Sequence, residues 1–302
     1  MYDKSDPRAA LKQSGVSFIS ATGLIAEPQV GLFYEEGPQI DEPSERTWLH
    51  RGHNFVLAYS ELKPGAVLER NGQVDEYALI LSDPEHSAQI SAGSETVEVP
   101  GYSIVFIPPG DSSITMPNGG KIVRLFSIES KDLAQQCGNA TAYDEPRIHI
   151  PDFEPWPEPN DGWKIRSYSL KVEKEEGRFG RIFRCTTFMI NYLEPQIGPR
   201  NPHKLSPHHH DDFEQCSLAL KGAFEHYLRR HWTVDMDDWC DDVTISCKAP
   251  SATVIPPPLI HTSRGTAESN QLVDIFCPPR IDFSEKPGWV LNADDYPMPT
   301  TK

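Results

Sequence analysis

Three consecutive histidines, His208, His209 and His210, are the residues of this chain best suited to chemistry. Imidazole is the commonest side-chain metal ligand near neutral pH. The segment that follows, 215–221, alternates small or polar with larger apolar residues, as a half-buried strand does. Residues two apart on a strand point to the same face. We therefore expect His208 and His210 to bind one metal ion together, with His209 facing away.

The next ligand is one of two neighbours, Glu214 or Gln215. Adjacent strand residues face opposite ways, so only one of them is expected to bind the metal. If Gln215 faces the interior, so do the small residues Ser217 and Ala219, which leaves room for a ligand. A carboxylate would bind a divalent cation more strongly than an amide. The strand pattern favours Gln215, and Glu214 remains the alternative.

A further ligand is available downstream, where the apolar strand 250–255 leads through Pro256, Pro257 and Pro258 to His261. Prolines fix the backbone of a turn, so His261 can be presented at little ordering cost. Three imidazoles and one oxygen suit Fe(II), Mn(II), Ni(II), Cu(II) or Zn(II). We expect one such ion, with Fe(II) first. The alternative is a surface run of histidines without a metal.

These two segments resemble the paired motifs of the cupin superfamily. The first motif reads His-x-His, three or four residues, Glu or Gln, six residues, Gly, and the second reads Pro-x-Gly, two residues, His. The chain departs from the pattern at Pro258, where glycine is usual, and it lacks a glycine six residues before the first histidine. The resemblance implies a small antiparallel β-barrel that holds a metal, and metal-dependent dioxygenases are among its members. The matching residues are His208, His210, Gln215, Gly222, Pro256, Pro258 and His261.

Short strand signals recur at intervals near ten residues, with Gly and Pro turns between them. This spacing is typical of an all-β sandwich or barrel. Strands are expected at 16–19, 30–33, 55–59, 77–81, 87–90, 103–107, 122–126, 184–190, 215–220, 253–255 and 272–276.

The two halves of the chain look like an internal repeat, which indicates duplication of one unit. The fold class predicted is therefore all-β, with two cupin-type antiparallel barrels in tandem, a bicupin. We expect an N-terminal barrel in residues 1–150 and a C-terminal barrel with the metal site in residues 151–302, joined by a proline- and acid-rich linker. The repeated segments are 55–64 with 187–195, 76–83 with 215–222, and 105–113 with 254–261.

The repeat also indicates that the first barrel is degenerate. Laying Glu76 on Gln215 replaces all three histidines of the second half by other residues. The alternative is a hard-ion site made by oxygen ligands of the first half. The replacements are Glu69 for His208, Asn71 for His210 and Ser113 for His261.

Composition excludes several classes of partner. The chain has 302 residues and a net charge of −16, which argues against nucleic acid and against anionic membrane surfaces. No apolar run approaches the roughly 18 residues of a membrane span, and the first residues lack the apolar core of a signal peptide. Six scattered cysteines fit a reducing compartment. We expect a cytoplasmic monomer or homodimer that acts on a small molecule.

The function that these residues favour is a metal-dependent dioxygenase acting on a small oxygenated organic substrate. His226 and Arg264 are candidates for binding the substrate, and an ordinary salt bridge is the favoured alternative for Arg264. One alternative is a non-redox isomerase or lyase acting on a sugar or keto acid, in which the metal is a Lewis acid and His226 or Glu225 moves protons. Another is a bicupin that binds a small molecule without catalysis.

Overall fold

The computed structural model describes residues 25–145, 147, 149–233 and 235–300. The expected strand at 16–19 lies outside these residues. The described chain contains two short α-helices, α1 (Lys131–Ala134) and α2 (Ile281–Ser284), and two 3-10 helices, η2 (Ala140–Tyr143) and η3 (Met236–Asp238). Its strands are β1 (Gln29–Leu32), β2 (Ile40–Glu42), β3 (Glu45–Arg51), β4 (Phe55–Leu62), β5 (Ala66–Gln73), β6 (Tyr77–Leu81), β7 (Ala88–Ala92), β8 (Glu95–Val99), β9 (Ser103–Ile107), β10 (Gly110–Met116), β11 (Gly120–Ser127), β12 (Arg166–Ser169), β13 (Arg181–Arg184), β14 (Met189–Tyr192), β15 (Gln196–Ile197), β16 (Gln215–Lys221), β17 (Ala223–Arg229), β18 (Val243–Lys248), β19 (Ser251–Ile255), β20 (Ile260–Gly265) and β21 (Ser269–Phe276).

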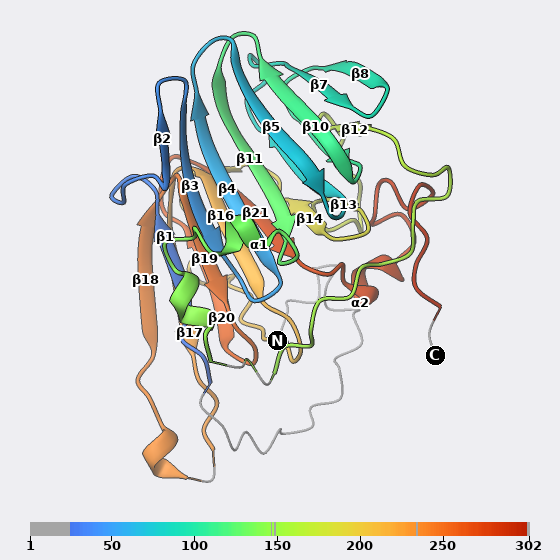
Figure 1. Cartoon of the computed structure of the whole chain (residues 1–302). Coiled ribbons are helices and arrows are strands. Elements are labelled where there is room, and N and C mark those ends of the chain that lie inside the picture. Colours follow the sequence, from blue (N-terminus) through green and yellow to red (C-terminus); the bar gives the residue numbers. More distant parts are fainter. Residues whose placement is uncertain (1–24, 146, 148, 234, 301–302) are drawn as a thin grey trace.

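The strands form two antiparallel barrels, each built from one large and one small sheet (Figure 1). In the first barrel the large sheet has the order β9-β6-β11-β4-β3-β2, and the small sheet has the order β5-β10-β7-β8. In the second barrel the corresponding orders are β19-β16-β21-β14-β13 and β18-β17-β20. The same strand order therefore occurs twice in one chain. The predicted fold class, two antiparallel barrels in tandem, is confirmed.

Each large sheet ends on a strand from the other half of the chain. Strand β1 pairs with β19, with Gln29 opposite Val254, and strand β12 pairs with β9, with Arg166 opposite Phe106. Strand β1 of the first half thus completes the second barrel, and strand β12 of the second half completes the first. The domain boundary expected near residue 150 stays a prediction.

Alternating residues on the central strands separate two interiors. In β6, Ala78 and Ile80 belong to the core between the two large sheets, whereas Tyr77 and Leu79 belong to the core of the first barrel. In β16, Cys216 and Leu218 belong to the same shared core. Both faces of these strands are covered, which explains why they are almost entirely buried.

The two barrel interiors differ in polarity. The first barrel is filled by apolar side chains, among them Leu79, Val105 and Phe126. In the second barrel, the inward side of β16 carries the polar residues Gln215 and Ser217. At the start of its central strand the second barrel therefore carries an amide and a hydroxyl, where the first barrel carries Tyr77 and Leu79.

The continuous strand expected at 184–190 is wrong in its middle, because residues 185–188 form a turn between two strands. Strand β13 ends at Arg184 and β14 begins at Met189, and the Cys185 N–H donates to the Phe188 carbonyl at 2.8 Å. Thr186 explains the break: its N–H and hydroxyl both donate to the Glu76 carboxylate, at 3.0 and 2.9 Å. Contacts with the other barrel thus outweigh the strand propensity of the segment.

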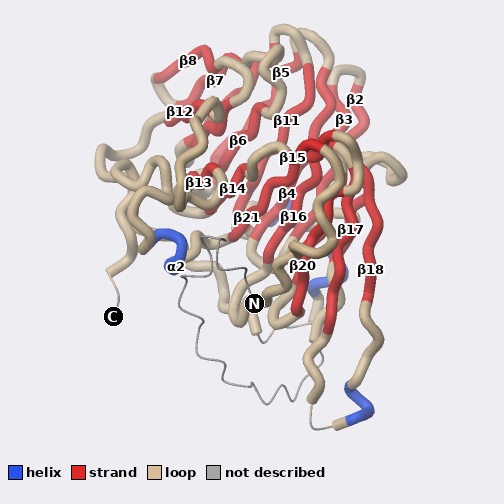
Figure 2. The backbone as a smooth tube through the Cα atoms, turned by 180° about the vertical axis from the view of Figure 1, so that it is seen from behind, coloured by secondary structure: helices blue, strands red, loops and turns tan. Residues whose placement is uncertain are grey.

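The chain ends by packing back against both barrels. The Trp289 indole N–H donates to the Gly177 carbonyl at 2.9 Å, and the Tyr296 hydroxyl donates to Glu76 at 2.7 Å. The β17–β18 hairpin is long, and its tip at η3 projects beyond the barrels (Figure 2). At that tip Trp232 stacks on Trp239 with ring centroids 4.9 Å apart.

Candidate metal centre

The structure brings His208, His210 and His261 together in the second barrel. One ring nitrogen from each lies within 4.8 Å of the others, an arrangement that could hold a metal ion. His208 and His261 form an antiparallel bridge, with N–H to O distances of 3.0 and 2.7 Å. This bridge joins the histidine-rich segment to β20. His209 faces away, and its Nε2 lies 3.3 Å from Asp211.

Backbone carbonyls fix the orientation of two of the three imidazoles. His208 Nδ1 lies 2.9 Å from the Ser206 carbonyl, and His261 Nδ1 lies 2.9 Å from the Leu259 carbonyl. A carbonyl can only accept, so Nδ1 carries the proton in both rings and Nε2 presents its lone pair. Such a contact is the usual way in which a protein orients a metal-binding histidine.

Gln215 points its side-chain oxygen at this cluster. Its Oε1 lies 3.0 Å from His210 Nε2 and 3.4 Å from His261 Nε2, and the residue is buried. Two donor atoms each about 2.1 Å from one ion, at a right angle, are about 3.0 Å apart. The residues present therefore fit a metal ion bound by three imidazoles and one amide oxygen.

Glu214 faces the opposite way and contacts the first barrel. Its Oε2 accepts from the His53 N–H at 2.6 Å, and its Oε1 accepts from the Tyr143 hydroxyl at 3.2 Å. Burial raises the pKa of this carboxyl to about 7. The alternation of strand side chains thus directs Glu214 into the interface between the barrels and Gln215 toward the histidines.

Asp274, which no sequence motif singles out, lies directly behind Gln215. Its Oδ1 accepts from Gln215 Nε2 at 3.1 Å and from the Ser217 hydroxyl at 3.0 Å. From its sequence the segment 272–276 is simply an apolar strand. An acidic residue within such a run is the signal that could have identified it, because an inward carboxylate needs a partner.

Aromatic and charged groups surround His210. Burial, followed by the charges of Arg280, His208 and His261, lowers the pKa of His210 well below its usual value. The neutral imidazole is the form that binds a metal. Phe213 stacks on the His210 ring with centroids 4.4 Å apart, and the Arg280 guanidinium lies 4.8 Å from the Phe213 ring.

A cavity of about 360 Å³ opens beside the cluster. His208, Gln215 and His261 form part of its wall. The remaining described residues of the wall are Lys174, Glu175, Arg178, Phe179, Gly180, Leu193, Glu194, Gln196, Arg200, Ser206, Phe224, Thr262, Ser263, Gly265, Asn270, Leu272 and Asp274.

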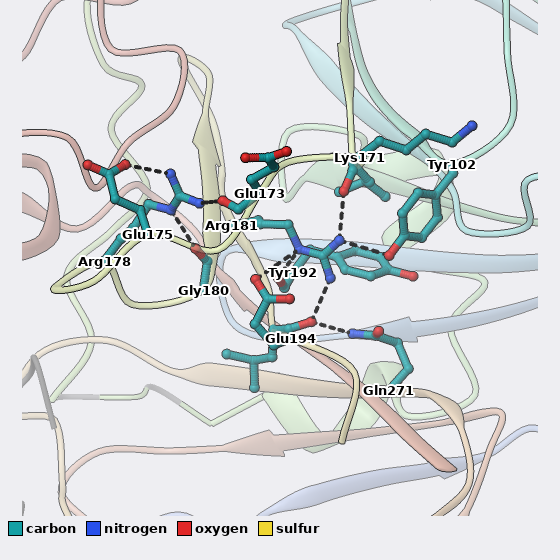
Figure 3. Close-up of polar contacts among 12 residues, drawn as sticks. Tyr102, Lys171, Glu173, Glu175, Arg178, Gly180, Arg181, Tyr192, Glu194 and Gln271 are labelled. Carbon is teal, nitrogen blue, oxygen red and sulfur yellow. Dashed lines mark hydrogen bonds and ion pairs between the residues drawn. The ribbon is translucent and has the colours of Figure 1, made fainter. Parts of the chain in front are cut away.

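Two arginines compensate acidic residues of the cavity wall. Arg178 lies 3.1 Å from Glu175, and Arg181 lies 3.7 Å from Glu194 (Figure 3). Arg181 also donates to the Tyr102 hydroxyl at 2.8 Å. Arg181 is buried, with 3% of its side chain exposed, whereas Glu194 has 38% of its side chain exposed.

The two predicted substrate-binding residues are not among the described residues that line the cavity. His226 is buried behind Ser263, with Nδ1 2.7 Å from its hydroxyl, and burial together with the charge of His261 lowers its pKa to about 4. Ser263 itself lines the cavity. Arg264 lies 3.1 Å from Glu225, an ion pair that is likewise absent from the described cavity wall.

The alignment of the two halves is wrong by one residue. Tyr77 is opposite Ile107 as Gln215 is opposite Ile255, so Tyr77, rather than Glu76, corresponds to Gln215. A shift of one residue exchanges the two faces of a strand.

The corrected register changes the other counterparts as well. Arg70 pairs with Ser112 in the first barrel as His208 pairs with His261 in the second, so Arg70 and Ser112 are the counterparts of these two histidines. The hydroxyls of Tyr77 and Ser112 form a hydrogen bond of 2.9 Å. Glu69 and Asn71 are exposed, whereas Glu76 is buried between the barrels. The alternative of a hard-ion site formed by these three residues is therefore wrong.

Comparisons with known proteins agree with this architecture. No family model matches the chain, and no curated protein matches it. Oxalate decarboxylase of Lactobacillus farciminis, in a formate complex, is similar in structure with a TM-score of 0.58 and 14% identity, over 87% of this chain and 89% of that one. A mutant of Bacillus subtilis oxalate decarboxylase gives 0.57 and 14%, over 87% and 80%. AerE from Microcystis aeruginosa gives 0.50 and 9%, over 85% and 99%.

These likenesses show the fold. The chain has the two-barrel architecture of the bicupins, as the resemblance of its motifs to the cupin superfamily implied.

Proposed function

We propose that the second barrel holds one divalent transition metal and that the protein is a metal-dependent enzyme. His208, His210, Gln215 and His261 would be the ligands. The observation that carries this proposal is the convergence of three imidazoles and one amide oxygen beside a cavity of about 360 Å³. A cavity of that size suits a small organic molecule.

The reaction we favour is oxidation of a small oxygenated substrate by O₂, with Fe(II) as the ion. The four protein ligands would leave about two positions of such an ion open, and the bound ion would supply sites there for a substrate oxygen and for O₂. All four donor groups are neutral, so the site favours a substrate that arrives as an anion. Lys174 and Arg200 in the cavity wall would attract that anion.

The hydroxyls of Thr262 and Ser263 line the same cavity and would orient the polar groups of a substrate. Phe213 and Phe276 lie against the His210 ring, with centroid distances of 4.4 and 6.0 Å, and would restrict water on that side. The protein would therefore bind, orient and partly desolvate the substrate.

A non-redox lyase is the second candidate. The structural similarity to oxalate decarboxylases favours it, because those proteins share the two-barrel architecture at low identity. Neither proposed acid–base residue supports it strongly. His226 is buried with a pKa lowered to about 4, and Glu225 is paired with Arg264. Binding without catalysis is the third candidate.

The test begins with metal analysis of protein purified without oxygen and reconstituted with Fe(II). The double variant His208→Ala/His261→Ala is the control. We expect one iron ion per wild-type chain and none in the control, and then oxygen uptake with one of a panel of small hydroxy and keto acids. Turnover without oxygen uptake would support the lyase. Metal binding without turnover would support a binding protein, and no metal in the wild type would refute the site.

We also propose a reducing compartment, such as the cytoplasm, for this protein, acting as a monomer or homodimer. All six cysteines lie in the described part of the chain, and none forms a disulfide. Within the described residues, no helix has both the length and the apolar character needed to cross a membrane.

A further inference from the structure

Gln215, Ser217 and Asp274 form a closed triangle of hydrogen bonds. Gln215 Nε2 donates to the Ser217 hydroxyl at 3.0 Å and to Asp274 Oδ1 at 3.1 Å. The Ser217 hydroxyl in turn donates to Asp274 Oδ1 at 3.0 Å. Both N–H groups of the amide are therefore used on this side, and the amide oxygen must face the other way, toward the histidines.

The reversed amide would be unfavourable on the Asp274 side, and on the histidine side it could not bind a metal ion. Its oxygen would face the Asp274 oxygen at about the present distance of 3.1 Å, and its N–H groups would replace the oxygen that now faces His210. Gln215 and Asp274 are only 4% and 8% exposed. A buried acceptor that faces another acceptor loses its hydrogen bond without compensation by water, which costs about 1–3 kcal/mol.

The carboxylate of Asp274 has no counterpart at the equivalent position of the first barrel, which also lacks the cluster of three histidines. Asp274 is directly opposite Ser217 on the neighbouring strand. In the first barrel Leu79 takes the place of Ser217, and the residue opposite it is Arg124. Tyr77 there replaces Gln215, so the amide and the carboxylate behind it are present or replaced together.

We propose that Asp274 is a positioning residue that holds the Gln215 oxygen toward the metal and sets which metal the site prefers. This inference rests on the proposed function of the second barrel. A glutamate ligand would bring its charge into contact with the ion. Here the Asp274 carboxylate instead contacts the far side of the neutral Gln215 amide. Carboxylate ligands favour harder ions such as Mn(II), and imidazole-rich sets suit Fe, Ni, Cu and Zn. The arrangement therefore disfavours Mn(II).

The proposal predicts that the two groups can be exchanged. In Gln215→Glu the new carboxylate has no N–H to donate and faces Asp274, so binding should weaken. In Gln215→Glu/Asp274→Asn the amide introduced at position 274 can donate to the carboxylate introduced at position 215, which restores one donor and one acceptor. The charge then contacts the ion directly.

The experiment measures dissociation constants for Co(II) and Mn(II) by competition with a chromophoric chelator, together with the visible spectrum of bound Co(II). The wild type is compared with four variants. They are Asp274→Ala, Asp274→Asn, Gln215→Glu and the exchanged double variant. Circular dichroism shows whether each variant is folded.

We expect Asp274→Ala to weaken Co(II) binding by about 10–100-fold and to change the Co(II) spectrum, as loss of a group that orients a ligand does. The exchanged variant should recover most of the loss caused by Gln215→Glu and should bind Mn(II) better, relative to Co(II), than the wild type. If Asp274→Ala does not fold, Asp274→Asn and the exchanged variant decide the question.

Two results would overturn the inference while leaving the metal site intact. One is wild-type affinity in both Asp274 variants. The other is an exchanged variant that binds no better than Gln215→Glu. A wild type that binds neither ion would instead refute the proposed function, and the inference with it.

Discussion

Glu76 and Glu214 occupy equivalent positions in the two barrels, and each accepts hydrogen bonds from a turn of the other barrel. Glu76 binds the Thr186 N–H at 3.0 Å, in the turn between β13 and β14. Glu214 binds the His53 N–H at 2.6 Å, in the turn between β3 and β4. Because Gln215 follows Glu214 directly, the strand that carries a proposed ligand is also anchored to the first barrel.

The neighbours Glu214 and Gln215 should therefore respond differently to truncation. Glu214→Ala removes two buried hydrogen bonds and should lower the free energy of unfolding by about 1–3 kcal/mol. It should leave the metal content unchanged. Gln215→Ala should weaken metal binding by at least about 10-fold with a smaller effect on stability. Urea unfolding and metal titration of both variants check this, and loss of metal in Glu214→Ala alone would assign the ligand to Glu214.

Glu214 should also make stability depend on pH. Burial raises its pKa to about 7 in the folded protein, above the ordinary value of 4.5. The folded state then binds more protons than the unfolded state between these values, so this group's contribution falls as pH rises from 4.5 to 7. Across this pH range the contribution of Glu214 to the free energy of unfolding changes by about 3 kcal/mol.

Glu214→Gln mimics the protonated acid, which gives a matched control for this contribution. The variant should be about as stable as the wild type near pH 4.5 and more stable above pH 7. Unfolding curves of both proteins across this range measure the difference. A difference independent of pH would contradict the assignment.

Arg200 should stabilise the geometry of the metal centre. It donates to the Ser263 carbonyl at 2.8 Å and to the Ser206 hydroxyl at 3.0 Å, and so joins β20 to the segment that precedes His208. Lysine keeps the charge but cannot make both contacts. Arg200→Lys should therefore weaken Co(II) binding by about 10-fold. Arg264→Lys, at the ion pair with Glu225, is the control and should bind Co(II) as the wild type does.

His50 should make the fold sensitive to acid. Burial lowers its pKa to about 4 from the ordinary value of 6.5. Below pH 6.5 the unfolded chain binds a proton at His50 that the folded protein does not bind. The stability that the neutral, buried imidazole contributes is therefore complete above pH 6.5 and is lost as pH falls toward 4. The contribution is about 3 kcal/mol. Comparison of wild type and His50→Gln across this pH range tests it, and equal pH dependence in the two proteins would contradict it.

Local sequence was sufficient to predict features that depend on the side-chain pattern of a single strand. The small size of Ser217 and Ala219 correctly indicated which face of β16 turns inward. His208 and His210 precede that strand, so the strand argument for their shared face was wrong, although their side chains do come together. The duplicated strand pattern correctly gave two barrels. The ion, and the ligand roles of these residues, remain proposals.

Contacts between distant segments could not be predicted in this way. The hydrogen bonds from Thr186 to Glu76 turned an expected strand into a hairpin turn. The one-residue error between the halves arose because Glu76 resembles Gln215 chemically, whereas the structure aligns Tyr77 with it by cross-strand pairing. Asp274 was missed because its role depends on a neighbour 59 positions away along the chain.

The crossing of β1 and β12 between the two halves has a consequence for the history of the chain. If one ancestral unit was duplicated, the copy that lacks the cluster of three histidines became a permanent part of the other copy's scaffold. Deleting it would leave the second large sheet without its edge strand β1 and would leave β12 unpaired. A gene for this architecture can therefore lose one site by substitution, but it cannot shed the half that carried it.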